Sequence, residues 1–189
     1  MTEINFTEEQ KQALLRIARE TGEAEIGRKP IPNFKELGEA QGLTFVPGGV
    51  FVSYHIGRYN RGCIGCFCPT QPLWRLVQTY AVHACHDSRF PRMTPQEFAT
   101  AHVEVSCLSV PVDVTNPLAC VVVGTHGVSV EYKGYRGTYL PQVAPSQGWD
   151  TPTLLKDVAY SKAGIPRSVD VLHDPNVHWQ TYTATVVSE

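Results

Sequence analysis

The stretch Arg61-Gly62-Cys63-Ile64-Gly65 places a thiol between two glycines, directly after an arginine. Residues 51–56, the turn-like residues 57–60 and the returning residues 61–67 together predict a β-hairpin that contains this stretch. Glycine has no side chain to pack, and inside a strand it marks a bulge or a close approach by backbone or ligand. We therefore expect something to come near the main chain around Cys63.

The spacing of apolar residues predicts two clear helices. The capping-box pattern Thr7-Glu8-Glu9-Gln10 opens a helix over residues 8–21, which we expect to stop at Gly22. From residue 73 to residue 84, apolar side chains recur at intervals of three and four, as on the buried face of a helix. Shorter helices are expected after Thr94 and Thr151, because threonine is a good N-cap.

Further strands are predicted by alternating or continuous apolar residues. Along residues 102–108, His102, Glu104 and Ser106 fall on one face and apolar side chains on the other. We also expect strands over residues 120–124, 128–132 and 177–187, and an extended segment over residues 140–145. The hairpin and the short connections favour an α+β fold, with a mostly antiparallel or mixed sheet flanked by helices, in a single domain over residues 1–189.

The composition is that of a globular protein with little net charge. The chain has 189 residues, of which 42% are hydrophobic and 18% charged, and its net charge of −2 gives no drive toward nucleic acid or anionic membrane. The acidic start lacks the apolar segment of a signal peptide, and the longest apolar run, residues 118–123, is too short to span a bilayer. We predict a soluble cytoplasmic protein, or a nuclear one if the chain is eukaryotic.

Several blocks of this sequence resemble the AMMECR domain family, named after the human Alport, midface-hypoplasia and elliptocytosis region. The stretch from Arg61 to Gly65 resembles the signature of that family. The other blocks follow in the order of the family between residues 51 and 164, and they are Asp87-Ser88-Arg89-Phe90, Glu104-Val105-Ser106-Cys107-Leu108-Ser109, Gly124-Thr125-His126-Gly127-Val128, Tyr139-Leu140-Pro141-Gln142-Val143-Ala144, Gly148-Trp149-Asp150 and Lys162-Ala163-Gly164. A single short motif would be weak, whereas blocks in register are specific.

This resemblance implies a compact fold, often described as two lobes with the signature near a groove between them. It implies no firmly established activity. Some relatives in prokaryotes are associated with a Memo-type partner and a radical S-adenosylmethionine protein, and the resemblance therefore implies a partner of that pathway. The chain departs from the family at Cys66 and Cys68, where thiols are not usual, and any role of these two would be particular to this protein.

Cys63 is the first candidate for chemistry. A nucleophilic thiol needs a nearby cation or backbone dipoles and a base within reach. His126 could supply the base, and Glu104 could orient that imidazole, which gives a hypothetical catalytic set of Cys63, His126 and Glu104. The alternative is that Cys63 is a small packing residue, and that its two glycine neighbours let another element approach.

A metal site is the weaker interpretation of the cysteines. The chain has six cysteines and no secretory signal, so reduced thiols are expected rather than disulfides. Zinc needs four ligands, and in a regular strand Cys63 and Cys66 point to opposite faces, while Cys66 and Cys68 share one. We therefore predict no metal site and no cofactor.

Arginine is the residue that favours an anionic ligand, because its planar fork suits carboxylate and phosphate. Arg61 is the first candidate. Glu104 is expected either to face water or to form a bond with Arg61. The residues predicted to bind the ligand are Arg61, Gly62, Cys63, Ile64, Gly65, Arg89 and Ser106. Two functions stay open: a groove-type binding module for a small anionic ligand or a partner protein segment, and a cysteine-dependent or partner-assisted enzyme acting on a small metabolite or modified nucleoside.

Overall fold

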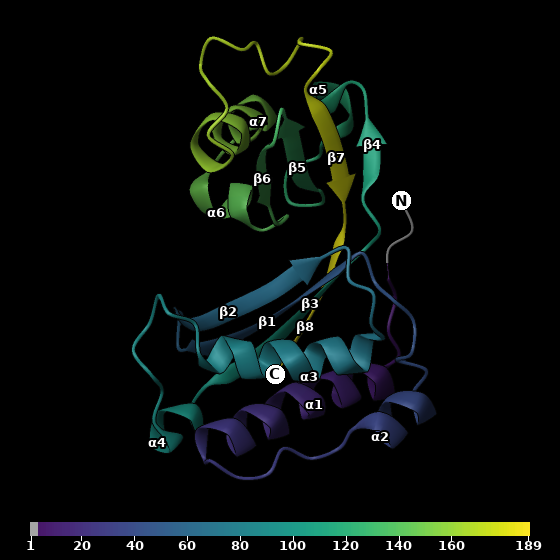
Figure 1. The fold of residues 1–189 in the computed structure, drawn as a ribbon, viewed down its shortest axis with the longest axis vertical. Coiled ribbons are helices and arrows are strands. Elements are labelled where there is room, and N and C mark those ends of the chain that lie inside the picture. The colour runs from purple at the N-terminus through teal and green to yellow at the C-terminus, as the bar shows by residue number, and fades with distance from the viewer. Residues whose placement is uncertain (1–3) are drawn as a thin grey trace. The chain divides into compact units, whose positions relative to one another are not determined.

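The computed structural model describes residues 4–189; residues 1–3, where the predicted domain and the acidic start begin, lie outside the described residues. The described chain divides into two compact units, both visible in Figure 1. The first unit comprises residues 4–108 and 185–189, and the second comprises residues 109–184. The prediction of one domain over residues 1–189 stays a prediction.

The first unit combines helices with a four-stranded sheet. Its elements are α1 (Glu8–Ile26), α2 (Lys35–Ala40), β1 (Gly49–Ile56), β2 (Tyr59–Phe67), α3 (Leu73–Cys85), α4 (Pro95–Phe98), β3 (His102–Leu108) and β8 (Ala184–Ser188). The strand order is β2-β1-β3-β8, and β1 pairs antiparallel with both β2 and β3. The predicted hairpin over residues 51–67 is therefore present, in the form of β1 and β2.

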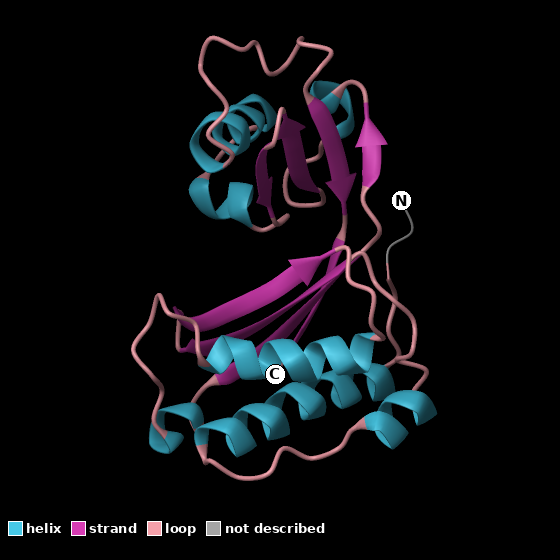
Figure 2. Ribbon diagram, viewed as in Figure 1, coloured by secondary structure: helices cyan, strands magenta, loops and turns pink. Residues whose placement is uncertain are grey.

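Helices α1 and α3 lie along one face of this sheet, as Figure 2 shows. Val50, Val52 and Tyr54 alternate along β1 toward these helices and are fully buried. The Tyr54 hydroxyl lies 3.1 Å from the carbonyl oxygen of Ala18 in α1 and 3.2 Å from that of Ala81 in α3. One side chain of the central strand thus ties both helices to the sheet.

Helix α1 begins where the sequence predicts but continues past Gly22. The Thr7 hydroxyl accepts a hydrogen bond from the Gln10 amide, and the Gln10 side chain accepts one from the Thr7 amide, which completes the capping box. The predicted stop at Gly22 is wrong, because the helix runs to Ile26. A Cβ atom on Gly22 would lie 2.4 Å from the Phe98 ring, so this glycine serves close packing.

The second unit holds the other four-stranded sheet, with strand order β4-β7-β5-β6. Its elements are β4 (Val112–Val114), α5 (Pro117–Cys120), β5 (Gly127–Tyr132), β6 (Tyr135–Tyr139), α6 (Val143–Gln147), α7 (Thr151–Asp157), the π-helical turn η1 (Val158–Lys162) and β7 (His178–Tyr182). Strand β7 pairs antiparallel with β4 and β5, and β5 pairs antiparallel with β6. Its core is separate from that of the first unit and includes Val130, Leu155 and Trp179.

Three other predicted segments differ from the structure. The strand over residues 120–124 is wrong: Asn116 caps the short helix α5, and Val122 beyond it is 54% exposed. Residues 140–145 are not wholly extended, because α6 begins at Val143. The tail over residues 177–187 forms two strands rather than one, β7 in the sheet of the second unit and β8 in that of the first.

The predicted fold class is confirmed, since antiparallel sheets flanked by helices make up an α+β protein. Within residues 4–189, none of the helices combines the length and the apolar character that crossing a bilayer requires.

Candidate functional site

The signature stretch places Cys63 on the far face of the first sheet, defined here as the face that points away from α1 and α3. Ser53 of β1 lies directly opposite Cys63 of β2 on one side and Glu104 of β3 on the other. The three residues form a row across three strands. Opposite neighbours in an antiparallel pair have Cα atoms about 4.5–5.5 Å apart, so the main chains of Cys63 and Glu104 are about 10 Å apart. The register thus places Cys63 and Glu104, two predicted site residues, on one face of the sheet, with Ser53 between them.

The neighbouring row contains Gly65, Phe51 and Ser106, in the same register. A Cβ atom on Gly65 would lie 2.5 Å from the Phe51 ring, so the missing side chain makes room for that ring. Ser106 is buried. Ile64 points the other way and packs against the core of the first unit. Ile64, also predicted to bind the ligand, is therefore a partly buried residue that packs against the core.

The close approach expected at the glycines is made by the protein itself. A Cβ atom on Gly62 would lie 2.1 Å from the carbonyl oxygen of Ala84, at the end of α3. No real Cβ contact is that short, so only glycine lets the main chain of α3 come this near to β2. The helix thereby supports the strand immediately before Cys63.

The main chain of Cys63 is held at the free edge of β2 by two side chains. Its N–H donates to Oδ2 of Asp87 at 3.0 Å, and its carbonyl oxygen accepts from Nη2 of Arg89 at 2.9 Å. Asp87 and Arg89 also bond each other, at 2.6 Å and 2.9 Å. They satisfy the donor and the acceptor that a neighbouring strand would satisfy. We call this pair the edge clip.

The edge clip lowers the pKa of the Asp87 carboxyl group. Arg89 donates hydrogen bonds to the Asp87 carboxylate, and together with the amides of Cys63 and Arg89 it lowers the pKa of Asp87 to about 2. The Asp87 side chain is only 2% exposed, whereas the Arg89 side chain is 63% exposed. A buried carboxylate that stays ionised thus anchors an arginine whose outer side faces solvent.

Arg61 does not bond Glu104, so that expectation is wrong. Its Nη2 atom lies 3.2 Å from Oε1 of Glu97, the residue that completes the capping box of α4. The reason is a register shift between Tyr54 and His55, which leaves Arg61 as an extra residue opposite β1 and turns it toward α4. Within residues 4–189, the Glu104 carboxylate has neither a hydrogen bond nor an ion pair.

His126 lies in the second unit, whereas Cys63 and Glu104 lie in the first. Its Nδ1 atom accepts a hydrogen bond of 3.1 Å from the amide of Val122. An amide can only donate, so Nδ1 is unprotonated and a neutral His126 carries its proton on Nε2. A base at Nε2 would require the other tautomer and the loss of this bond. The catalytic set of Cys63, His126 and Glu104 stays a prediction.

The cysteines after the signature lie apart from Cys63. Cys66 points into the core face of the sheet, opposite Val50, so it and Cys63 are on opposite faces, as the strand spacing predicts. Among residues 4–189, His, Cys, Asp and Glu side chains do not gather in groups of three that could hold a metal ion.

Sequence reasoning missed Ser53, Glu97 and the role of Asp87 at this site. Ser53 is placed by strand register, which fixes its neighbours only once the pairing of β1 is known. Glu97 had a signal in the capping box after Thr94, but nothing local links that box to Arg61. The pairing of Asp87 with Arg89 follows from their spacing; the bonds of both to Cys63 do not.

Comparison with known proteins supports one family. The AMMECR1 family model matches residues 15–187 and so runs through both units. A protein of Aeropyrum pernix is 37% identical over 178 residues, which cover 88% of this chain and 74% of that protein. One from Nanoarchaeum equitans is 30% identical over 182 residues, covering 93% of this chain and 98% of that protein. The crystal structure of an uncharacterised protein from Pyrococcus horikoshii is similar, with a TM-score of 0.82, 29% identity and coverage of 96% of this chain and 92% of that chain.

Proposed function

We propose that this chain, which belongs to the AMMECR1 family, is a binding protein whose site is centred on residues 61–65 and whose ligand is a small anion bearing a carboxylate or phosphate group. The site comprises the far face of β2 around Cys63 and the edge of β2 that carries the clip. It lies wholly within the first unit.

The observation that carries this proposal is the fixed main chain at Cys63. The edge clip holds its N–H and its carbonyl on one side, and β1 pairs with β2 on the other. The end of α3 supports the strand at Gly62. A site that is already ordered loses little conformational entropy when a ligand binds, and this favours binding there.

Two arginines near Cys63 support the proposed negative charge of the ligand. Arg61 precedes it by two residues in β2, and Arg89 bonds its carbonyl oxygen. Arg61 uses Nη2 for Glu97, and Arg89 uses Nε and Nη2 for Asp87 and the carbonyl of Cys63. Across residues 4–189, the other guanidinium N–H groups of Arg61 and Arg89 have no hydrogen-bond acceptor. Planar donors of this kind suit the paired oxygens of carboxylate and phosphate.

The enzyme alternative has less support. Thiol catalysis needs a base that can take the proton of Cys63, directly or through one water. The bond from Val122 to His126 leaves the proton on Nε2, and Glu104 lies two strands away from Cys63. Binding requires neither residue as a base. A Memo-type or radical S-adenosylmethionine partner stays a prediction, and an acidic segment of such a partner could use the same arginines.

The test is a titration of the 15N-labelled chain with inorganic phosphate and with citrate, followed by the backbone amide resonances. We expect saturable shifts centred on Gly62, Cys63 and Gly65. In Arg61→Gln, loss of a charge-assisted hydrogen bond should weaken the affinity by roughly tenfold or more. Arg58→Gln is the matched control, because Arg58 is exposed and lies over the Tyr59 ring, 5.2 Å from its centre.

Two results would count against the proposal. Shifts that spread evenly over exposed basic residues would indicate non-specific screening of charge. An equal loss of affinity in Arg58→Gln and Arg61→Gln would show that net charge, rather than the position of Arg61, governs binding.

A further inference from the structure

A pocket of about 320 Å³ lies in the first unit beside the end of β2, on the side that faces α3. The residues that line it are uncharged, and they are Cys66, Phe67, Cys68, Pro69, Thr70, Gln71, Leu76, Thr79 and Tyr80. Two of them are cysteines, separated by a single residue. The proposed anion site uses neither of these thiols.

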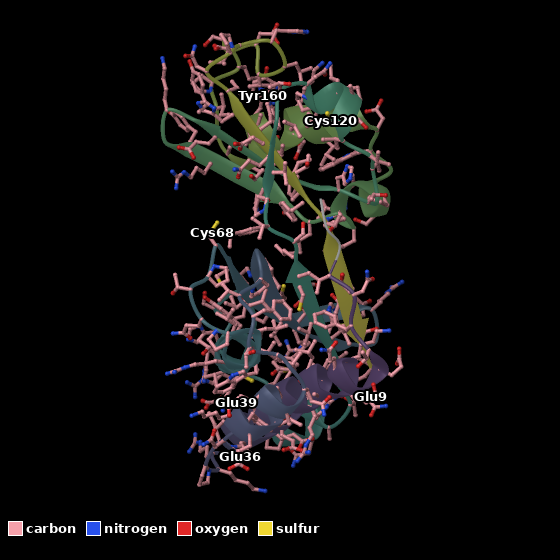
Figure 3. All side chains as sticks on the ribbon, turned by 90° about the vertical axis from the view of Figure 1, so that its right-hand side faces the viewer. Glu9, Glu36, Glu39, Cys68, Cys120 and Tyr160 are labelled. Carbon is pink, nitrogen blue, oxygen red and sulfur yellow. The ribbon has the colours of Figure 1, made fainter. Side chains whose placement is uncertain are left out.

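The two thiols differ in their surroundings. Cys66 is half-buried, and its thiol beside the Tyr80 hydroxyl raises the pKa of Tyr80 to about 12. Cys68 is exposed at the surface of the first unit (Figure 3). Its main chain adopts φ 50°, a left-handed conformation that is uncommon for residues other than glycine, and its amide donates to the carbonyl of Gly48 at 2.9 Å. An accessible thiol and a sheltered one thus share one pocket.

The spacing of the two cysteines allows a disulfide at some strain. Cys66 lies in β2, and Cys68 lies one residue beyond the end of that strand. Residues two apart in an extended chain have Cα atoms about 6.6–6.8 Å apart, which is the upper end of the range that disulfides span, and a less extended chain brings them closer. A bond closed at that limit is strained, and strained, exposed disulfides are the readily reduced ones. In this structure both residues are free thiols.

We propose that Cys66 and Cys68 form a redox-active dithiol that exchanges with low-molecular-weight disulfides of the glutathione class. The thiolate of Cys68 attacks one sulfur of oxidised glutathione, the S–S bond breaks, and one glutathione leaves and takes up a proton. The sulfur of Cys66 then attacks the Cys68 sulfur, and the second glutathione leaves with the other proton. The protein loses two hydrogens, and two molecules of reduced glutathione are formed.

Three of the other four cysteines supply internal comparisons. Burial raises the pKa of the Cys85 thiol and that of the Cys107 thiol to about 12, so both should stay unreacted in the folded protein. Cys120 is exposed and lies at the end of α5 in the second unit. Cys120 should form only a mixed disulfide with glutathione, because neither α5 nor the residues after it contain a second cysteine that could displace the glutathione.

The experiment treats the full chain with oxidised glutathione and maps every cysteine by mass spectrometry of peptides. We expect the peptide that contains residues 66–68 to lose two hydrogens, and Cys120 to carry only a glutathione adduct. In Cys66→Ser, the adduct on Cys68 should persist roughly tenfold longer or more, since the neighbouring thiol that resolves it is gone. Reduced glutathione should restore both thiols in the wild-type protein.

A second readout tests the pocket itself. With 13C-labelled tyrosine, the pKa of Tyr80 should fall from about 12 toward its ordinary value near 10 when oxidation removes the thiol partner. Tyr80→Phe assigns the resonance and should still form the disulfide. A stable adduct on Cys68 with Cys66 reduced would overturn the proposal. So would the same modification pattern in the wild-type protein and in Cys66→Ser.

Discussion

Replacing Asp87 by Asn tests whether the edge clip stabilises β2 around Cys63. The Asp87 carboxylate accepts hydrogen bonds from the amide of Cys63 and from the amide and guanidinium of Arg89. Asparagine keeps the size of the side chain and one acceptor oxygen. It loses the negative charge that makes the bonds to Arg89 strong.

The magnitude follows from the pKa of Asp87, which lies at about 2 instead of its ordinary 3.8. At about 1.36 kcal/mol for each pH unit, this difference corresponds to roughly 2 kcal/mol in favour of the folded state. The Arg89 side chain is 63% exposed, so water screens part of the interaction. We therefore expect Asp87→Asn to lower the free energy of unfolding at pH 7 by about 1–2 kcal/mol.

The sign of the pH dependence is fixed by the direction of the pKa. Folding lowers the pKa of Asp87, so its contribution is complete above about pH 4 and is lost as the pH falls toward about 2. The wild-type protein and Asp87→Asn should differ most near neutral pH. They should converge in stability near pH 2.

The assay is native-state hydrogen exchange at the Cys63 amide, combined with urea unfolding between pH 2 and pH 7. Glu131→Gln is the control, because Glu131 pairs with Arg136 on the exposed surface of the second unit and should change stability little. A stability difference that stays constant from pH 7 to pH 2 would refute this account of the clip. So would a Cys63 amide that exchanges equally slowly in Asp87→Asn.

Three other changes test separate parts of the protein. Gly62→Ala should destabilise it by about 1–3 kcal/mol in urea unfolding, because the new Cβ would overlap the carbonyl of Ala84, and an unchanged midpoint would contradict this. Tyr54→Phe should cost about 1–2 kcal/mol, since it removes the buried hydroxyl that lies between two helix carbonyls, and protection factors of α1 and α3 should fall with it. The rate at which iodoacetamide labels Cys63 should depend on pH in the same way in His126→Ala as in the wild-type protein, because His126 is bonded to the Val122 amide. Slower labelling in the variant would support the hypothesis of thiol catalysis.

Local pattern was enough to predict much of the fold. The hairpin over residues 51–67 has strands separated by a short turn, and the apolar stripe from residue 73 to residue 84 has the period of a helix, so both are decided by neighbours in sequence. The failures occur where tertiary packing overrides a local signal. Gly22 resembles a helix stop but fits against Phe98, and the apolar run after Cys120 belongs to no strand.

The candidate site was harder to predict than the fold. The type of residue suggested Arg61, Cys63 and Glu104, but their mutual positions depend on the register of β1 with both of its neighbours. The bulge that turns Arg61 toward Glu97 is one extra residue in that register. Sequence spacing carries no information about such a shift, so the partners of a charged side chain cannot be derived from it.

The two strands near the end of the chain have a consequence for how the protein is made. β7 lies inside the sheet of the second unit, between β4 and β5, and β8 completes the sheet of the first. A ribosome releases residues in order, so neither sheet is complete until residues 178–188 have emerged. Until then, β3 lacks its partner β8 and β5 lacks its partner β7, so each strand has an unpaired edge. Such edges promote aggregation and are shielded by chaperones. Both sheets are therefore complete only after translation has passed residue 188.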